Sequence, residues 1–392
     1  MHIGVFGRRN VGKSSVLNAL VRQQVSIVSD VPGTTTDPVE KVMELKPIGP
    51  VVFIDTAGID DTGELGISRI KKTKQVVERT ELAVLVAEAW NSYEDGLLKL
   101  FKDNNIPVVV AANKSDVRGN DVLEVAAKNA GCNFIVTTSV LNEAGFDELR
   151  AAIAMATPKE FMTTPPVLEG LIKPEDLVVL VTPIDIEAPA GRMLLPQVQT
   201  LRDILDSDAY CLTVKEHQLA HALACLKEPP ALVVTDSQAF EKVSKIVPPE
   251  VPLTSFSILF ARLKGDLYEL AKGVESISSL KEGDNILIAE SCSHHPLKDD
   301  IGREKIPRWL QQYTGVKLNI EVISGRDFPE DITKYKLIIH CAGCMFNRQQ
   351  MLSRIEKAKK AHIPITNYGM VISYIHGIFA RAMKPFEITA TR

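Results

Sequence analysis

A glycine-bracketed loop near the start of this 392-residue chain has the residue types that bind phosphate. Gly7 and Gly12 enclose the loop, and Lys13 and Ser14 follow it directly. Glycines let a backbone wrap phosphate with its N–H groups, and the helix that follows offers its positive N-terminus. In such loops the lysine reaches the β- and γ-phosphates, and the serine hydroxyl binds Mg²⁺. The segment therefore predicts a nucleotide-phosphate site.

Later loops could complete a guanine-nucleotide site. Asp55 would hold Mg²⁺ through water, and the N–H of Gly58 would sense the γ-phosphate. The Asp116 carboxylate can accept two hydrogen bonds from guanine N1 and N2, which adenine cannot supply. We expect Lys13, Asp55 and Gly58 to act in catalysis. The residues expected to contact nucleotide are Asn10, Val11, Gly12, Lys13, Ser14, Ser15, Thr35, Asp55, Gly58, Asn113, Lys114, Asp116, Ser139 and Val140.

Cysteine and histidine residues nearer the C-terminus have metal-ligand spacing. Two residues separate Cys341 from Cys344, so both sulfurs can reach one metal ion, and His340 precedes the pair. Cys292 and His294 lie in an earlier loop. The set could be a redox dithiol, a structural Zn²⁺ site, or three thiolates that hold an iron–sulfur cluster with one weaker ligand. The chemistry of these side chains leaves zinc and a cluster equally open.

Apolar strand-like runs alternate with helical patterns in residues 1–160. Such alternation predicts an α/β domain with a mostly parallel sheet and helices on both faces. The nucleotide motifs follow its strands, and ligands of such sheets bind at the carboxyl ends of the strands. We expect strands at 2–7, 51–55, 82–87, 107–112 and 133–137, and helices at 13–22, 66–80, 93–104 and 122–130.

Two smaller α/β domains are expected after this P-loop domain and a proline-punctuated linker. A middle domain would span 165–265, and a C-terminal domain would span 266–392. The middle domain carries no catalytic constellation, so a spacer or assembly role is the simplest interpretation. Its expected strands are at 177–182, 210–214 and 231–235, and its expected helices are at 196–205, 216–226 and 237–246.

The C-terminal domain places its cysteines after strands. Cys292 follows a predicted strand at 285–289, and Cys341 follows one at 335–340. If these strands are parallel neighbours, both loops and Cys344 converge at one edge of the sheet. The other elements expected here are a strand at 316–323 and helices at 266–280, 348–361 and 368–380.

Composition and charge argue against nucleic-acid-binding, membrane-spanning and disulfide-rich secreted proteins. The net charge of −4 provides no basic field to recruit nucleic acid or anionic membrane. No apolar run reaches the ~18–20 residues needed to cross a bilayer. The first predicted strand begins at His2, so we expect no signal peptide, and six cysteines are too sparse for a disulfide scaffold. We therefore expect a cytoplasmic protein with reduced thiols.

The P-loop domain resembles translation-factor-class GTPases, especially the Era and TrmE-like group. Residues 32–37 resemble that group's switch I, and residues 55–59 resemble its switch II. Ile59 stands where Ras-type proteins have the glutamine that orients water, a task that an aliphatic side chain cannot perform. The resemblance implies that Asn10 helps to hold K⁺, which could do the electrostatic work of an arginine finger. Asn10 could instead be only a turn residue.

The whole chain resembles the FeFe-hydrogenase maturation GTPases. The resemblance rests on three features in order along the chain. They are the GTPase domain, then Cys292 and His294, and then the run from His340 to Cys344. The resemblance implies a 4Fe–4S cluster on Cys292, Cys341 and Cys344. The fourth ligand could be His294, His340, a nearby carboxylate such as Glu290, or water, and the sequence does not choose among them. The resemblance also implies a scaffold that carries a diiron precursor to the FeFe-hydrogenase apoprotein, two radical-SAM maturases as partners, and a homodimer built through the middle domain.

Two other functions fit parts of the sequence. An Era- or TrmE-like GTPase associated with RNA or ribosomes could carry a C-terminal zinc module, but the balanced charge disfavours the basic surface that it needs. A metabolic iron–sulfur enzyme with a regulatory GTPase would need a substrate pocket with acid and base residues, and none stands out. Cofactors expected on the main interpretation are GTP or GDP, Mg²⁺, K⁺ and the cluster.

Overall fold

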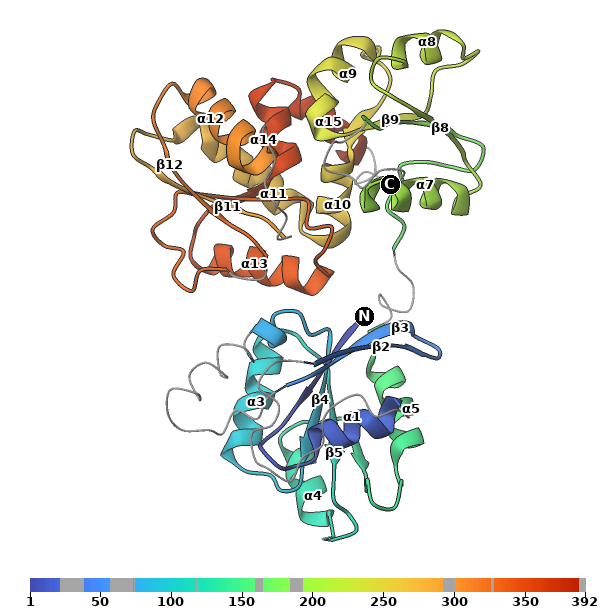
Figure 1. Cartoon of the computed structure of the whole chain (residues 1–392), viewed down its shortest axis with the longest axis vertical. Coiled ribbons are helices and arrows are strands. Elements are labelled where there is room, and N and C mark those ends of the chain that lie inside the picture. The colour runs from blue at the N-terminus through green and yellow to red at the C-terminus, as the bar shows by residue number, and fades with distance from the viewer. Residues whose placement is uncertain are drawn as a thin grey trace. The chain divides into compact units, whose positions relative to one another are not determined.

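The computed structural model divides the chain into two compact units, residues 1–164 and 165–392 (Figure 1). No helix among the described residues is both long and apolar enough to cross a membrane. The predicted site residues Thr35, Gly58, Cys292 and His294 lie outside the described part of the chain. The structure describes residues 1–21, 39–56, 73, 75–117, 119–158, 165–183, 193–291, 300–325 and 328–387.

The first unit is built on a six-stranded sheet with the order β2-β3-β1-β4-β5-β6. All neighbouring pairs are parallel except β2 and β3. Its strands are β1 (His2–Phe6), β2 (Val39–Leu45), β3 (Gly49–Asp55), β4 (Leu82–Ala87), β5 (Val108–Ala112) and β6 (Phe134–Thr137). The predicted strands are present. Strand β2 was missed because Lys41 lies among its less exposed positions and Val42 is exposed, so the residues do not show the alternation expected of a half-buried strand.

Helices cover both faces of this sheet. Successive strand side chains point to opposite faces. Ile3 and Val5 pack with α1 and α5 on one face, whereas Phe6 and Ile54 pack with α3 on the other, where α4 also contacts Val110. The helices are α1 (Lys13–Val21), α3 (Ser92–Asp103), α4 (Asp121–Asn129) and α5 (Phe146–Ala156). The predicted α/β class with a mostly parallel sheet is confirmed.

The second unit contains two four-stranded sheets, and every neighbouring pair in them is parallel. The first has the order β10-β9-β7-β8 and the second β12-β11-β13-β14. Their strands are β7 (Leu177–Val181), β8 (Tyr210–Val214), β9 (Leu232–Thr235), β10 (Leu253–Ser255), β11 (Asn285–Ala289), β12 (Asn319–Ile323), β13 (Leu337–His340) and β14 (Ile365–Asn367). The two further α/β regions match the predicted fold class.

Helices flank both sheets of the second unit. Around the first sheet lie α7 (Leu195–Asp206), α8 (Leu219–Ala224), α9 (Phe240–Ile246) and α10 (Phe256–Lys264). Around the second lie α11 (Leu267–Val274), α12 (Ile306–Thr314), α13 (Arg348–Lys360), α14 (Tyr368–Ile375) and α15 (Phe379–Glu387). The helix predicted at 368–380 is wrong in extent, because Gly377 adopts φ +70 and separates α14 from α15.

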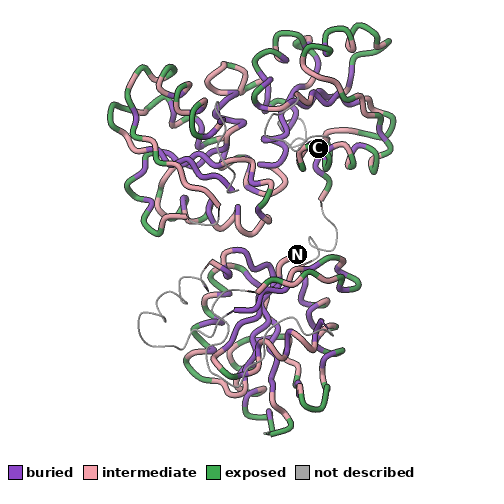
Figure 2. The backbone as a smooth tube through the Cα atoms, viewed as in Figure 1, coloured by how far each residue is buried: buried purple, intermediate pink, exposed green. Residues whose placement is uncertain are grey.

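One hydrophobic core runs through both sheets of the second unit. Buried residues from Val178 in β7 to Phe386 in α15 form a single cluster, and β7, β9, β11 and β13 are buried along most of their length, unlike the edge strands β8 and β12 (Figure 2). Helix α15 returns to contact β10 of the first sheet (Figure 1). The two regions are therefore packed as one body, and the predicted boundary at residues 265 and 266 remains a prediction.

Helix α11 approaches β14 so closely that only glycine fits at the contact. A Cβ atom added to Gly273 would lie 1.9 Å from the backbone oxygen of Ile365. Because that oxygen belongs to the backbone of β14, which is paired with β13, it cannot move aside as a flexible side chain would.

We expect Gly273→Ala to lower the free energy of unfolding of the second unit by about 3 kcal/mol, since overpacking displaces backbone. Hydrogen exchange of the β13 and β14 amides measures this value. Lys272→Ala, an exposed change on the same helix, should alter it by less than ~0.5 kcal/mol. Equal effects of the two substitutions would contradict the prediction.

Candidate nucleotide site and cysteine site

The phosphate loop between β1 and α1 needs glycine at both of its predicted positions. Gly7 and Gly12 adopt φ values of +148 and +92. A Cβ atom at Gly7 would lie 2.2 Å from the Val86 oxygen, and one at Gly12 would lie 2.5 Å from Asn113 Nδ2. Both glycines are therefore required by backbone conformation and by close approach.

Lys13, Ser14 and Asp55 come together at the carboxyl edge of the sheet. The buried Lys13 ammonium donates to the carbonyl oxygens of Gly7 at 3.0 Å and Arg8 at 2.7 Å, so the loop closes around it. The Ser14 hydroxyl donates to Asp55 Oδ2 at 2.5 Å, and Asp55 is fully buried at the end of β3. A hydroxyl and a carboxylate are oxygen ligands that Mg²⁺ prefers. That Lys13 binds phosphate and that Ser14 and Asp55 hold Mg²⁺ remain predictions.

The predicted base-binding loops are linked to the phosphate loop. Asn113 follows β5 and donates from Nδ2 to the Val11 oxygen at 2.9 Å. Thr138 follows β6 and donates to Asn113 Oδ1 at 3.2 Å. The neighbouring Ser139 hydroxyl donates to Asp116 Oδ1 at 2.5 Å. The structure thus brings the loops after β1, β3, β5 and β6 to one edge.

The remaining predicted nucleotide residues lie in or beside these loops. Asn10 is exposed at the tip of the phosphate loop with φ +62, and Ser15 lies in the first turn of α1. Lys114 has φ +61 and pairs with Glu88 at 2.6 Å. Val140 is half-buried directly after Ser139.

Sequence reasoning missed a part-buried ion pair beside the phosphate loop. Arg8 donates from Nε to Glu94 Oε1 at 2.8 Å and from Nη2 to the Ala89 oxygen at 3.3 Å. Glu94 is fully buried; burial raises the pKa of its carboxyl, and the Arg8 charge opposes that rise. The available signal was the capping box of α3, in which Glu94 accepts from the backbone of Asn91.

The two strands that precede the cysteines are neighbours, which is the condition that the sequence argument required. Strands β11 and β13 pair in parallel, with Ala289 opposite His340. Cys341 therefore lies beside the loop that leads to Cys292. Its Sγ accepts the Ser291 N–H at 3.1 Å and lies 2.9 Å from the Ser291 hydroxyl oxygen. Burial raises the pKa of the Cys341 thiol, whereas the hydrogen bonds to its sulfur lower it.

His340 is placed in a way that argues against its being a cluster ligand. Arg354 can only donate, so His340 Nε2 must accept its Nη1–H at 2.9 Å. The other nitrogen then donates to the Cys341 oxygen at 2.9 Å. Full burial, followed by the Arg354 charge, lowers the pKa of His340 to about 3, so the ring is neutral with both nitrogens engaged.

Glu290, another residue next to the cysteine loop, is also held by neighbours. Its Oε2 accepts from Arg303 at 3.1 Å and from Ser324 at 3.0 Å, and it is almost fully buried. Within the described residues, no group of three or more His, Cys, Asp and Glu side chains is placed to hold a metal ion. Cys344 is half-buried, and the predicted ligands Cys292 and His294 are outside those residues.

Three protein-family models match successive parts of the chain. The model described as 50S ribosome-binding GTPase matches residues 2–114. The hydrogen maturase F dimerization domain matches residues 167–265, and the hydrogen maturase F tetramerization domain matches residues 268–385. The chain belongs to the hydrogen maturase F family. Its N-terminal unit is a GTPase domain of the kind that the sequence predicted.

Curated relatives match the GTPase domain of this family member. The tRNA modification GTPase MnmE of Bacillus licheniformis is 39% identical over 152 residues, which is 38% of this chain and 33% of that protein. The MnmE protein of Shouchella clausii is 38% identical over 155 residues, with the same shares. The chain therefore spans about a third of the length of these relatives. A solved structure of Aquifex aeolicus Era, 23% identical, covers 63% of this chain and 97% of its own with a TM-score of 0.36.

The Asp116 loop predicts the nucleotide preference of the protein. We expect the wild type to turn over GTP but not ATP. Asp116→Asn should weaken GTP binding by roughly tenfold to a hundredfold, since a charge-assisted hydrogen bond is lost, and should favour xanthosine nucleotides. Titration with each nucleotide measures the change. Asp121→Asn, at the exposed start of α4, is the matched control and should behave as wild type. Equal turnover of ATP and GTP would contradict this prediction.

Proposed function

We propose that this protein is a GTP-hydrolysing scaffold of hydrogenase maturation. It would bind a 4Fe–4S cluster on Cys292, Cys341 and Cys344, and carry a diiron precursor to the FeFe-hydrogenase apoprotein. The observation that supports this most is the parallel pairing of β11 with β13, because Cys341 directly follows β13 and the chain leaves β11 towards Cys292 at the same edge of the sheet. Membership in the hydrogen maturase F family supports the same reading.

The residues around Cys341 fit a thiolate that binds iron. The Ser291 N–H and hydroxyl both lie at the Cys341 sulfur, and N–H or O–H groups at sulfur tune the potential of iron–sulfur clusters. When bound, the cluster would supply an iron whose fourth ligand can be exchanged. Because His340 and Glu290 are engaged by other side chains, we infer that this ligand comes from elsewhere, with His294 as a remaining candidate.

The other parts of the chain have roles consistent with a carrier. Residues 167–265 match a dimerization domain, so we infer a homodimer built through this region. The two radical-SAM maturases of the pathway and the hydrogenase apoprotein would be its partners. GTP binding and hydrolysis would act as a switch that alters partner affinity, which is the general behaviour of such GTPase loops.

We further infer that K⁺ assists hydrolysis. Asn10 is exposed at the tip of the phosphate loop, where a side-chain oxygen could hold a monovalent cation beside the phosphates. Such a cation stabilises the charge that develops between the β- and γ-phosphates. Ile59, in the predicted switch II, cannot orient water in place of a glutamine.

If K⁺ assists hydrolysis, the rate of GTP turnover should depend on which monovalent cation is present. GTP turnover should be about tenfold or more faster in KCl than in NaCl at equal ionic strength. Asn10→Gly should remove most of this difference, because glycine accepts the φ of +62 and only the side chain is lost. Asn105→Gly is the matched control, since Asn105 is also exposed with a positive φ of +55 but follows α3, away from the phosphate loop. Equal rates in the two salts would defeat the inference.

The proposed function is tested by reconstituting the iron–sulfur cluster anaerobically and by variants that each disable only one of the two sites. Iron, sulfide and zinc analysis should give a 4Fe–4S cluster in the wild type. Lys13→Ala should abolish GTP turnover and retain the cluster, whereas Cys341→Ser should lose most of the cluster and retain turnover.

Cys225→Ser is the control for this test, because Cys225 is exposed at the end of α8 and should leave both properties unchanged. A colourless protein that binds zinc would contradict the proposal and support the RNA-associated GTPase instead. Loss of both properties in either of the two site variants would contradict the separation of the sites.

A further inference from the structure

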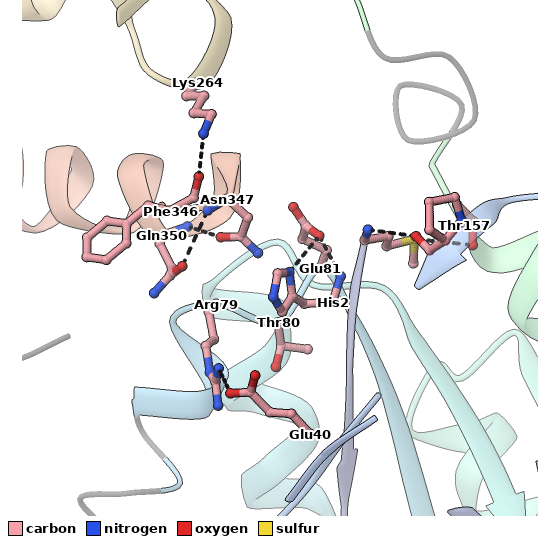
Figure 3. Close-up of polar contacts among 12 residues, drawn as sticks. His2, Glu40, Arg79, Thr80, Glu81, Thr157, Lys264, Phe346, Asn347 and Gln350 are labelled. Carbon is pink, nitrogen blue, oxygen red and sulfur yellow. Dashed lines mark hydrogen bonds and ion pairs between the residues drawn. The ribbon is translucent and has the colours of Figure 1, made fainter. Parts of the chain in front are cut away.

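The loop that carries Cys341 and Cys344 is organised around one ammonium group. Lys264 Nζ donates to the carbonyl oxygens of Gly343 at 3.1 Å, Cys344 at 2.9 Å and Phe346 at 2.8 Å. Figure 3 shows the contact between Lys264 and Phe346. An ammonium has three donors, so the three carbonyls match its full capacity.

The lysine comes from a different part of the sequence than the loop. Lys264 is the last residue of α10, in the stretch matched by the dimerization domain, whereas the loop lies in the stretch matched by the tetramerization domain. The contact is reciprocal, because Arg348 at the start of α13 donates to the Leu263 oxygen at 2.7 Å. Two cations thus join the end of α10 to the cysteine loop and to the first residue of the helix that follows it.

Other features hold the loop in the same conformation. Gly343 adopts φ +65, and a Cβ atom there would lie 2.7 Å from Met351 Sδ. At the other end of the loop, Asn347 and Gln350 form the capping box that begins α13 (Figure 3). The loop carbonyls are therefore turned toward Lys264 by a backbone that is fixed at both ends.

We propose that Lys264 is a positioning residue for the Cys341–Cys344 pair. It holds the loop in one conformation in the metal-free protein, so that the two cysteines are preorganised for metal binding. It also places a positive charge beside the Cys341–Cys344 loop. Preorganised ligands bind with less ordering cost. A nearby positive charge favours the more negative, reduced state of a cluster and so raises its reduction potential. The statement about potential rests on the proposed function, whereas the statement about loop order does not.

The first experiment uses the apoprotein. Hydrogen exchange of the amides in residues 341–347 should be at least about tenfold faster in Lys264→Met than in the wild type, since hydrogen bonds from a charged donor are lost. Lys264→Arg, which keeps the charge and donors, should restore most of the protection. Lys360→Met is the control, because Lys360 is exposed on α13 and its ion pair with Glu356 is long, at 3.8 Å.

Lys264→Gln guards against loss of folding in Lys264→Met, because it retains a donor and should give an intermediate exchange rate. The exchange of β11 and β13 amides in each variant reports whether the sheet is intact. Exchange of residues 341–347 that is unchanged in Lys264→Met and Lys264→Gln, with the sheet intact, would overturn the proposal.

The second experiment uses the reconstituted protein. The midpoint potential of the cluster should shift to more negative values in Lys264→Met and return toward the wild-type value in Lys264→Arg. A purely structural role would leave the potential in place, and that result would overturn the charge effect. If the wild type assembles no iron–sulfur cluster, the proposed function fails, while the exchange experiment still decides whether Lys264 positions the loop.

Discussion

Parallel strand pairing is the constraint on which both candidate sites depend. Parallel neighbours present their carboxyl ends at the same edge of a sheet, so loops far apart in the sequence become adjacent. In the first unit this edge gathers the phosphate loop, Asp55 and Asn113; in the second it places Cys341 beside the loop that leaves β11. A slip in either register would separate these groups, whatever their side chains.

The two sites also share a way of ordering a loop. Lys13 lies within bonding distance of two carbonyls of the phosphate loop, and Lys264 lies within bonding distance of three carbonyls of the cysteine loop. In each loop the backbone turns so that these carbonyls face the ammonium. A glycine with positive φ in each loop, Gly12 and Gly343, makes that turn accessible.

Buried polar groups around the cysteine loop are paired with one another. His340 joins Arg354 to the Cys341 carbonyl, and Glu290 joins Arg303 to Ser324. A low local dielectric strengthens such hydrogen bonds, and breaking one would leave a buried polar group without a partner, which costs free energy. A histidine next to a cysteine motif can thus serve the backbone of the loop rather than a metal ion.

The sequence by itself determined the α/β class, the order of the nucleotide motifs and the spacing of Cys341 and Cys344, because these depend on local pattern and residue type. That the two strands before the cysteines are parallel neighbours was only a condition of the sequence argument, and the structure supplied it. The sequence did not reveal the edge strand β2, the split between α14 and α15, or the burial of Glu94 under Arg8. Only the tertiary structure decided that His340 pairs with Arg354 and that Lys264 reaches the cysteine loop, because such contacts join residues whose separation in the chain carries no periodic signal.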